Sequence, residues 1–199
     1  KHPFSSSTIV LHMDGNMSIE NQINRINTNF HKKKEWLEGH MKEGKWSNFI
    51  FWVEKTFRLD MFMKYEEKLT DEEYWETLGQ VFISTEIQTD RMDEWIEVFN
   101  SKRPNREYLL TEDEDLDFFN QLPDQVEIWR GVRDEDWIEG LSWTTDKEQG
   151  EWFSKRFSHS TQILCNGWIE KDKILMSSEH ENLIVCNPKD ITDLKTMTT

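Results

Sequence analysis

Two glutamates stand two residues apart in Glu179-His180-Glu181, directly before an apolar run. In an extended segment, alternation places both carboxylates on one side of the chain and His180 on the other. Such a pair can divide the work of cleaving a glycosidic bond, because one acid stabilises the oxocarbenium-like state while the other positions or deprotonates the nucleophile. Taken alone, the triplet is also typical of a solvated hairpin in a chain with 39 acidic residues.

Two further clusters could serve the same chemistry. Arg130 ends an alternating, strand-like segment and offers a planar fork of donors for a phosphate or carboxylate, and Gly131 lets the backbone approach a ligand closely. Ser142 and Thr144 flank Trp143, so their hydroxyls share one side of an extended strand and could orient a carboxylate or bind a ribose. Taken singly, these clusters are better explained as a surface arginine at a turn and as an edge strand before a helix cap.

In their order along the chain, the three clusters resemble the Arg–Ser–Glu class of mono-ADP-ribosyltransferases, the cholera-toxin-like branch of the NAD-using transferases. The likeness covers residues 123–195 and is greatest to small phage and bacterial members. The usual Ser-Thr-Ser element is here Ser142-Trp143-Thr144, and the loop before the paired acids is short, Met176-Ser177-Ser178. That loop helps to choose the acceptor in the family, so the resemblance says least about the acceptor.

The resemblance implies a role for each matching residue. Arg130 would hold the phosphate and the nicotinamide-side ribose of NAD, and the Gly131 backbone would bind the nicotinamide amide. Ser142 would hold Glu181 in place, and Thr144 would support the same wall of the NAD-binding site. Glu181 would bind the ribose 2′-hydroxyl and stabilise the oxocarbenium ion as nicotinamide leaves.

Glu179 would position the guanidinium of an acceptor arginine or take its proton, since Glu at this place goes with arginine acceptors in the family. The nicotinamide ring also needs an aromatic face, for which Trp152 and Phe153 are near in sequence, with Phe157 beside them, and Arg156 could reach a phosphate. These four residues are also explained as helix core and solvated charge. The resemblance requires no metal, and the sequence holds no Cys/His ligand spacing.

Helices are expected to precede the strands that carry these clusters. Apolar residues recur at helical spacing in four stretches before residue 100: 19–30, 46–57, 74–82 and 92–99. Capping boxes begin at Thr70 and Thr111, and Pro123 ends a helix that includes Leu116 and Phe119. These patterns predict a helical lobe over residues 17–122, with residues 1–16 as a leader or an N-terminal arm.

The pattern changes to short strands after Pro123. Strands are predicted at 126–130, 140–144, 161–169, 173–176, 182–186 and 191–194, with one helix over 146–157 whose Trp152 and Phe153 face inward. The fold class is therefore α+β, with a mainly antiparallel sheet of the ADP-ribosyltransferase type over residues 123–199. So small a sheet would bury little core alone, so we expect the lobe to cover it as one cooperative unit.

The amino-acid composition limits the kinds of partner and the cellular location to be expected for the protein. The net charge is −15 and is spread along the chain, which disfavours a nucleic-acid binder and favours a basic protein partner. No apolar run is long enough to cross a membrane, and the first residues are too short and polar for a signal peptide. Cys165 and Cys186 both lie in apolar runs, which suggests reduced, buried thiols and a cytoplasmic location in a bacterial or infected host cell.

The sequence thus predicts an NAD-dependent mono-ADP-ribosyltransferase, a phage or bacterial effector that modifies a protein acceptor at arginine. Two alternatives remain open. An NAD glycohydrolase would use the same three clusters with water as the acceptor. A non-catalytic protein would use its acidic, Trp-rich helices to mask a basic partner, although the presence of Arg130, Ser142 and Glu181 favours catalysis.

Overall fold

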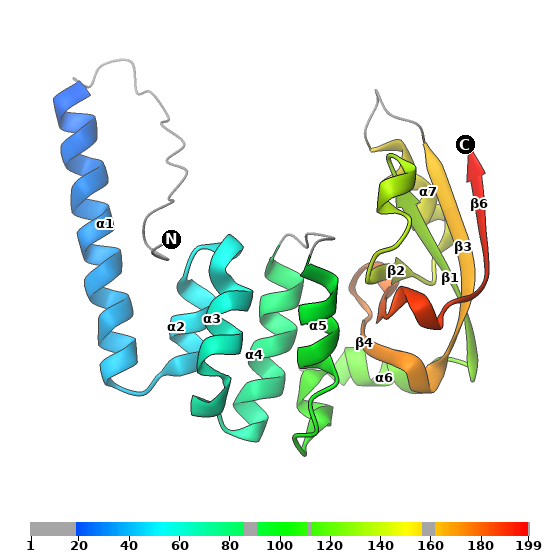
Figure 1. Ribbon diagram of the computed structural model, residues 1–199, viewed down its shortest axis with the longest axis horizontal. Coiled ribbons are helices and arrows are strands. Elements are labelled where there is room, and N and C mark those ends of the chain that lie inside the picture. Colours follow the sequence, from blue (N-terminus) through cyan, green and yellow to red (C-terminus); the bar gives the residue numbers. More distant parts are fainter. Residues whose placement is uncertain (1–18, 86–90, 111–112, 157–161, 199) are drawn as a thin grey trace. The chain divides into compact units, whose positions relative to one another are not determined.

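The computed structural model describes residues 19–85, 91–110, 113–156 and 162–198 (Figure 1). The chain divides into two compact units, Lys1–Glu86 and Ile87–Thr199. The predicted leader or arm, residues 1–16, lies outside the described residues. The predicted boundary between lobe and sheet stood after residue 122, whereas the second unit already begins at Ile87 and takes two of the predicted helices with it.

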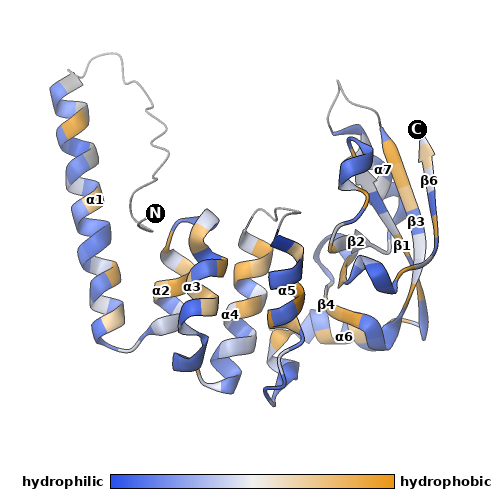
Figure 2. Cartoon of the chain, in the orientation of Figure 1, coloured by the Kyte–Doolittle hydropathy of each residue, from blue (hydrophilic) through white to orange (hydrophobic). Residues whose placement is uncertain are grey.

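The first unit is helical. Its helices are α1 (Ile19–Lys42), α2 (Trp46–Trp52), α3 (Arg58–Tyr65) and α4 (Asp71–Ser84). The capping box that begins α4 is confirmed, because Thr70 Oγ1 accepts from the Glu73 amide at 3.2 Å and the Thr70 amide donates to Glu73 Oε2 at 2.9 Å. Aromatic rings dominate its core, where Phe49, Phe62 and Trp75 are buried. By contrast, α1 is hydrophilic along most of its length (Figure 2).

One helix prediction is wrong. The stripe over 46–57 does not form a single helix, because α2 ends at Trp52 and Val53 is extended, with ψ 164°. The Val53 carbonyl accepts from Arg58 Nε at 3.3 Å, and the Phe57 amide turns back to Glu54 O at 2.8 Å. A short turn therefore separates α2 from α3, and apolar spacing alone did not reveal it.

The second unit contains α5 (Met92–Phe99), α6 (Asp113–Gln121), α7 (Lys147–Lys155) and six strands. The helix predicted over 92–99 is confirmed, and α6 ends before Pro123 as predicted. The capping box predicted at Thr111 lies outside the described residues. The strands are β1 (Gln125–Val132), β2 (Ser142–Thr144), β3 (Ile163–Glu170), β4 (Ile174–Ser178), β5 (Leu183–Cys186) and β6 (Thr192–Thr198).

The six strands form one sheet in the order β4-β5-β2-β1-β3-β6, and every described pairing is antiparallel (Figure 1). The prediction of an α+β fold with helices before an antiparallel sheet is confirmed. The central strand β1 pairs with β3 along its whole length but with β2 at one described position, Trp129 opposite Thr144. The two strands therefore separate just after Trp129, next to Arg130.

The two faces of the sheet are covered differently. Val126, Ile128 and Val132 alternate along β1 and face the hydrophobic core, against which side chains of α6 pack. The intervening Trp129 and Gly131 lie beneath α7, whose Gly150 meets both of them. The six strands lie where the sequence predicted them. Most residues of β3 are buried on both faces of the sheet, which explains why its sequence is a nearly continuous apolar run.

Candidate functional site

The paired acids lie in a turn between β4 and β5. Glu179 has helical dihedrals, φ −60° and ψ −34°, and its carbonyl accepts from the Asn182 amide at 3.0 Å. The segment is therefore a tight turn and not an extended strand, so the argument from alternation does not apply to Glu179, His180 and Glu181. All three residues are exposed to solvent. The carboxylates of Glu179 and Glu181 are accessible to a ligand from outside the protein.

The same turn holds two residues in the left-handed region, Glu181 at φ 60° and Asn182 at φ 47°. Such backbone is costly for a residue other than glycine, and it persists where surrounding contacts hold it. The end of β2 and the residue after it supply those contacts: the Thr144 hydroxyl donates to Glu181 O at 2.9 Å, and the Thr145 amide donates to Asn182 O at 3.0 Å. The backbone of Glu181 is thereby fixed to β2.

Ser142 and Thr144 lie on one face of β2, because Trp143 between them is buried in the core on the other face. Thr144 is the residue that contacts Glu181, and its hydroxyl also accepts from the Asp146 amide at 3.1 Å. Ser142 stands opposite Val185 in the register, farther along β5 from the turn. The contact that the resemblance implies for Ser142 is thus made by Thr144, to a backbone atom of Glu181.

Arg130 is half-buried and points to the core face, since it alternates with Val126 and Ile128 along β1. Its guanidinium donates to Ser142 O at 2.6 Å and to Trp137 O at 3.2 Å, at the place where β1 and β2 separate. A Cβ at Gly140 would overlap this guanidinium, so the close approach requires a glycine there. Burial lowers the pKa of Arg130, because the charged form loses hydration.

The structure therefore joins the three clusters in two pairs. Arg130 contacts Ser142 through the Ser142 carbonyl, and Thr144 contacts Glu181 through the Glu181 carbonyl. Strand alternation places the Arg130 side chain on the core face and the two β2 hydroxyls on the face covered by α7. Adjacent strands carry the clusters, but their side chains do not all point to one side of the sheet.

Gly131 has a packing role of its own. A Cβ there would overlap the Gly150 carbonyl and the Ser154 amide, so α7 can lie on β1 only if this position is glycine. Gly150 makes the reciprocal fit, since a Cβ at that position would lie 2.9 Å from the Trp129 Cβ. The glycine after Arg130 thus fixes α7 against the strand, a reason that the sequence pattern did not reveal.

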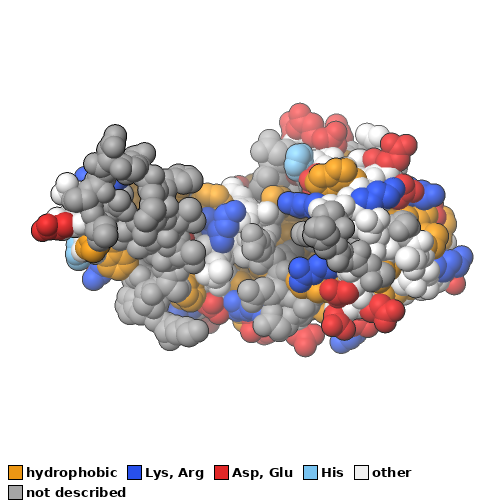
Figure 3. Space-filling model, turned by 90° about the horizontal axis from the view of Figure 1, so that it is seen from above, with side chains coloured by type: hydrophobic (Ala, Val, Ile, Leu, Met, Phe, Trp, Pro, Cys, Tyr) orange, Lys and Arg blue, Asp and Glu red, His pale blue; other side chains and the backbone are white. Residues whose placement is uncertain are grey.

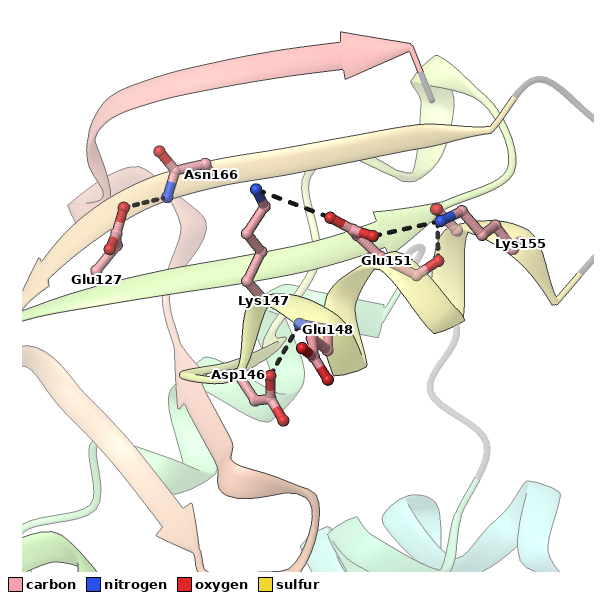
Figure 4. Close-up of polar contacts among 8 residues, drawn as sticks. Glu127, Asp146, Lys147, Glu148, Glu151, Lys155 and Asn166 are labelled. Carbon is pink, nitrogen blue, oxygen red and sulfur yellow. Dashed lines mark hydrogen bonds and ion pairs between the residues drawn. The ribbon is translucent and has the colours of Figure 1, made fainter.

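Helix α7 begins after Asp146, whose Oδ1 accepts from the Glu148 amide at 2.8 Å (Figure 4). Glu151 lies between two cations on the helix surface, 3.8 Å from Lys147 Nζ and 3.3 Å from Lys155 Nζ (Figure 4). Because Thr144 binds the Asp146 amide, the helix start and the Glu181 turn are both tied to one hydroxyl.

The prediction that Trp152 faces inward is wrong. Its side chain is 54% exposed, because the inward position of α7 is taken by Gly150 and Ser154 against β1. The Trp152 ring meets Phe153 edge to face at 5.1 Å, and the Arg156 guanidinium lies 5.6 Å from its centroid. Trp152 and Arg156 are exposed on the outer side of α7, whereas Phe153, the other residue predicted to face inward, is partly buried. Phe157, named with them in the sequence analysis, lies outside the described residues.

Sequence reasoning missed two residues that support the site. Asp115 on α6 is buried, and its Oδ1 accepts from the Glu179 amide at 2.8 Å. Arg106 donates to Leu175 O at 2.8 Å and to Phe99 O. Asp115 stands in a run of acids, 112–115, in which nothing in the sequence distinguishes it from its neighbours.

Charges are mixed on the surface around these elements. On the face shown in Figure 3, the described Lys and Arg side chains lie between Asp and Glu side chains. Within residues 19–85, 91–110, 113–156 and 162–198, no group of three or more His, Cys, Asp or Glu is placed to hold a metal ion. No helix in the same ranges is both long and apolar enough to span a membrane.

No protein-family model, curated protein or solved structure gave a significant match to this chain.

Proposed function

We propose that the protein is an NAD-dependent mono-ADP-ribosyltransferase that modifies arginine on a basic protein. The observation that supports this most is the strand order. It brings Arg130 on β1, Ser142 and Thr144 on β2, and the Glu179–Glu181 turn before β5 onto neighbouring strands, with hydrogen bonds from β1 to β2 and from β2 to the turn. The clusters whose order resembles the family in sequence thus lie on adjacent strands.

In the proposed reaction, the bond between the nicotinamide nitrogen and ribose C1′ breaks, and its electron pair leaves with nicotinamide. The carboxylate of Glu181 binds the 2′-hydroxyl and stabilises the positive charge on the ribose. A guanidinium nitrogen of the acceptor then forms the new bond to C1′, and its proton passes to Glu179. Both acids are exposed, which suits transfer to a macromolecule that docks from outside.

The net charge of −15 supports a basic acceptor protein and weighs against a nucleic-acid acceptor. Both cysteines are free and buried, which supports a reducing compartment such as the cytoplasm of a bacterium or infected host cell. Likeness to small phage and bacterial members of the family supports a role as an effector.

A second candidate is NAD hydrolysis by the same residues. The exposure of Glu179 and Glu181 favours it, because water reaches the turn as readily as a protein acceptor does. In this reaction water attacks C1′, and free ADP-ribose is released together with nicotinamide. The two reactions share their first step and differ in the labelled product.

The test is to incubate a bacterial lysate with NAD labelled in the adenylate moiety, and to measure nicotinamide release and labelled protein in parallel. The variants are Glu181→Gln and a matched control, Glu170→Gln, which neutralises another exposed acid at the end of β3. We expect Glu181→Gln to lower nicotinamide release by about 10²–10³-fold, the size seen when one preorganised stabilising group is removed. The control should keep wild-type activity.

Circular dichroism must show that both variants are folded. A wild-type protein that releases no nicotinamide would refute the proposed function. Wild-type activity in Glu181→Gln would remove Glu181 from the mechanism. Labelled protein identifies the transferase, whereas nicotinamide release with free ADP-ribose alone identifies the hydrolase.

A further inference from the structure

A buried acid from a different element holds the start of the Glu179–Asn182 turn. Asp115 is the third residue of α6 and is 9% exposed. Its Oδ1 lies 2.8 Å from the amide nitrogen of Glu179, which donates to it. Helix α6 packs against β4, the strand that leads into the turn. The carboxylate thus joins the helix to the first of the paired acids.

The turn needs such an attachment at both ends. Glu181 and Asn182 have left-handed backbone, a conformation that an isolated turn of these residues would readily leave. The far end is held by Thr144 and Thr145, which donate to the carbonyls of Glu181 and Asn182. At the near end the Ser178 hydroxyl accepts from the His180 amide at 3.2 Å, and Asp115 holds the Glu179 amide.

A charged acceptor suits this position. Hydrogen bonds to a carboxylate are stronger than those to a neutral carbonyl, and they strengthen where water is excluded. The Asp115 carboxylate is buried, whereas the Glu179 side chain is exposed, so the bond fixes the backbone and leaves the Glu179 carboxylate accessible. In the described contacts Asp115 acts on the backbone of the turn, through Oδ1.

We propose that Asp115 is a positioning residue that, together with Thr144, holds the Glu179–Asn182 turn in the strained geometry that presents both acids to the substrate. The inference rests on the proposed function for its catalytic consequence. Its structural part, the anchoring of the turn by Asp115, stands independently of the reaction.

The experiment compares Asp115→Ala, which removes the acceptor, with Asp115→Asn, which keeps a carbonyl acceptor at the same place. Asp117→Ala is the matched control, because Asp117 is an exposed acid on the same helix. The first readout is hydrogen exchange of the Glu179 amide in the full-length chain, followed by nuclear magnetic resonance. We expect exchange in Asp115→Ala to rise on the order of tenfold, exchange in Asp115→Asn to rise less because a neutral carbonyl is the weaker acceptor, and exchange in Asp117→Ala to stay near wild type.

The second readout is the kinetics of nicotinamide release. We expect kcat to fall about tenfold in Asp115→Ala while KM for NAD changes less than about twofold, since a misplaced Glu181 weakens transition-state stabilisation more than ground-state binding. Asp115→Asn should restore most of kcat. Thr144→Val, which removes the hydroxyl at the other end, should lower kcat similarly, and the double variant should lose less than the product of the two falls.

Unchanged Glu179 exchange in Asp115→Ala would overturn the proposal, as would equal kcat losses in Asp115→Ala and Asp115→Asn, or faster exchange with wild-type kcat. If Asp115→Ala does not fold, the exchange and kcat of Thr144→Val and Asp115→Asn decide. If the wild-type protein releases no nicotinamide, the proposed function fails, while faster exchange of the Glu179 amide in Asp115→Ala would still establish the anchor.

Discussion

The two edge strands of the sheet are built in opposite ways. All five residues of β4 are buried, α6 packs against it, and Arg106 binds the Leu175 carbonyl. All seven residues of β6 are exposed, and the strand carries an irregularity in its pairing with β3, where Asp193 has φ 51°. An irregular, charged edge resists pairing with other chains, whereas a covered edge gains rigidity from its own domain.

The candidate acids, Glu179 and Glu181, follow β4, which is the covered edge of the sheet. The turn after β4 receives contacts from α6 and from β2, so its strained residues rest on the best-supported side of the sheet. None of the candidate site residues lies on β6, which is the open edge of the sheet. The comparison suggests that rigidity near β4 serves the geometry of Glu179 and Glu181, and that changes near β6 should be tolerated.

The largest expected effect is on chemistry at the covered side. Glu179→Gln should lower transfer to protein by about 10²-fold or more, because a neutral amide cannot take a proton from the acceptor guanidinium. Nicotinamide release should fall much less, since water needs less help to trap the oxocarbenium ion. Parallel assays of nicotinamide and labelled protein measure both, with Glu170→Gln as the control. An equal fall in both products would show that Glu179 does not act on the acceptor.

The next effect is on stability of the covered edge. Arg106→Met keeps an unbranched chain but leaves the carbonyls of Leu175 and Phe99 without the guanidinium. We expect the free energy of unfolding to fall by about 2–3 kcal/mol, the usual range for lost hydrogen bonds to a charged donor that leave buried partners unsatisfied. Denaturant unfolding measures it. A change below about 0.5 kcal/mol would mean that α6 alone covers the edge.

A smaller difference should appear between the two thiols. Cys165 lies on β3 beside the open edge, and Cys186 lies on β5 beside the covered edge. Both are fully buried, and burial raises the pKa of Cys165 to about 11 and of Cys186 to about 12. Local opening of β6 should let a thiol reagent reach Cys165 on the order of tenfold faster than Cys186 at pH 8.

Mass spectrometry of each labelled peptide over time gives the two rates, and equal rates would show that both thiols become accessible in a single global opening. The pH dependence has a defined sign. A thiol ionises near pH 8.5 in the unfolded chain, so the stability linked to these raised pKa values is present below about pH 8.5. It is lost as the pH rises toward 11 and 12, where the folded thiols would ionise.

The smallest effect is expected on the open edge itself. Leu194 on β6 is 43% exposed, so Leu194→Thr should change the free energy of unfolding by less than about 0.5 kcal/mol. Leu175→Thr on β4 is the matched substitution at a residue that is 8% exposed, and it should cost clearly more. Denaturant midpoints of the two variants give the comparison. Equal losses would contradict the difference between the edges.

Much of the fold was predictable because local signals specify it. The capping box at Thr70, the alternation before Arg130 and the helix start at Asp146 each depend on neighbours within a few residues. The break after Trp52 was missed because it is stabilised by Arg58, a side chain beyond the repeat that predicted the helix. The orientation of Trp152 was missed because the close approach of Gly150 to β1 decides which side of α7 is buried.

The sequence by itself determined the elements, the antiparallel α+β class and the three clusters with their order, because periodicity, caps and residue types are local properties. Only the tertiary structure decided which clusters touch. Because of the register of β2 against β5, Thr144 and not Ser142 contacts Glu181. Where β1 separates from β2, the Arg130 side chain turns toward two backbone carbonyls. The position of Asp115 beneath Glu179 depends on the packing of α6 against β4, which no spacing along the chain encodes.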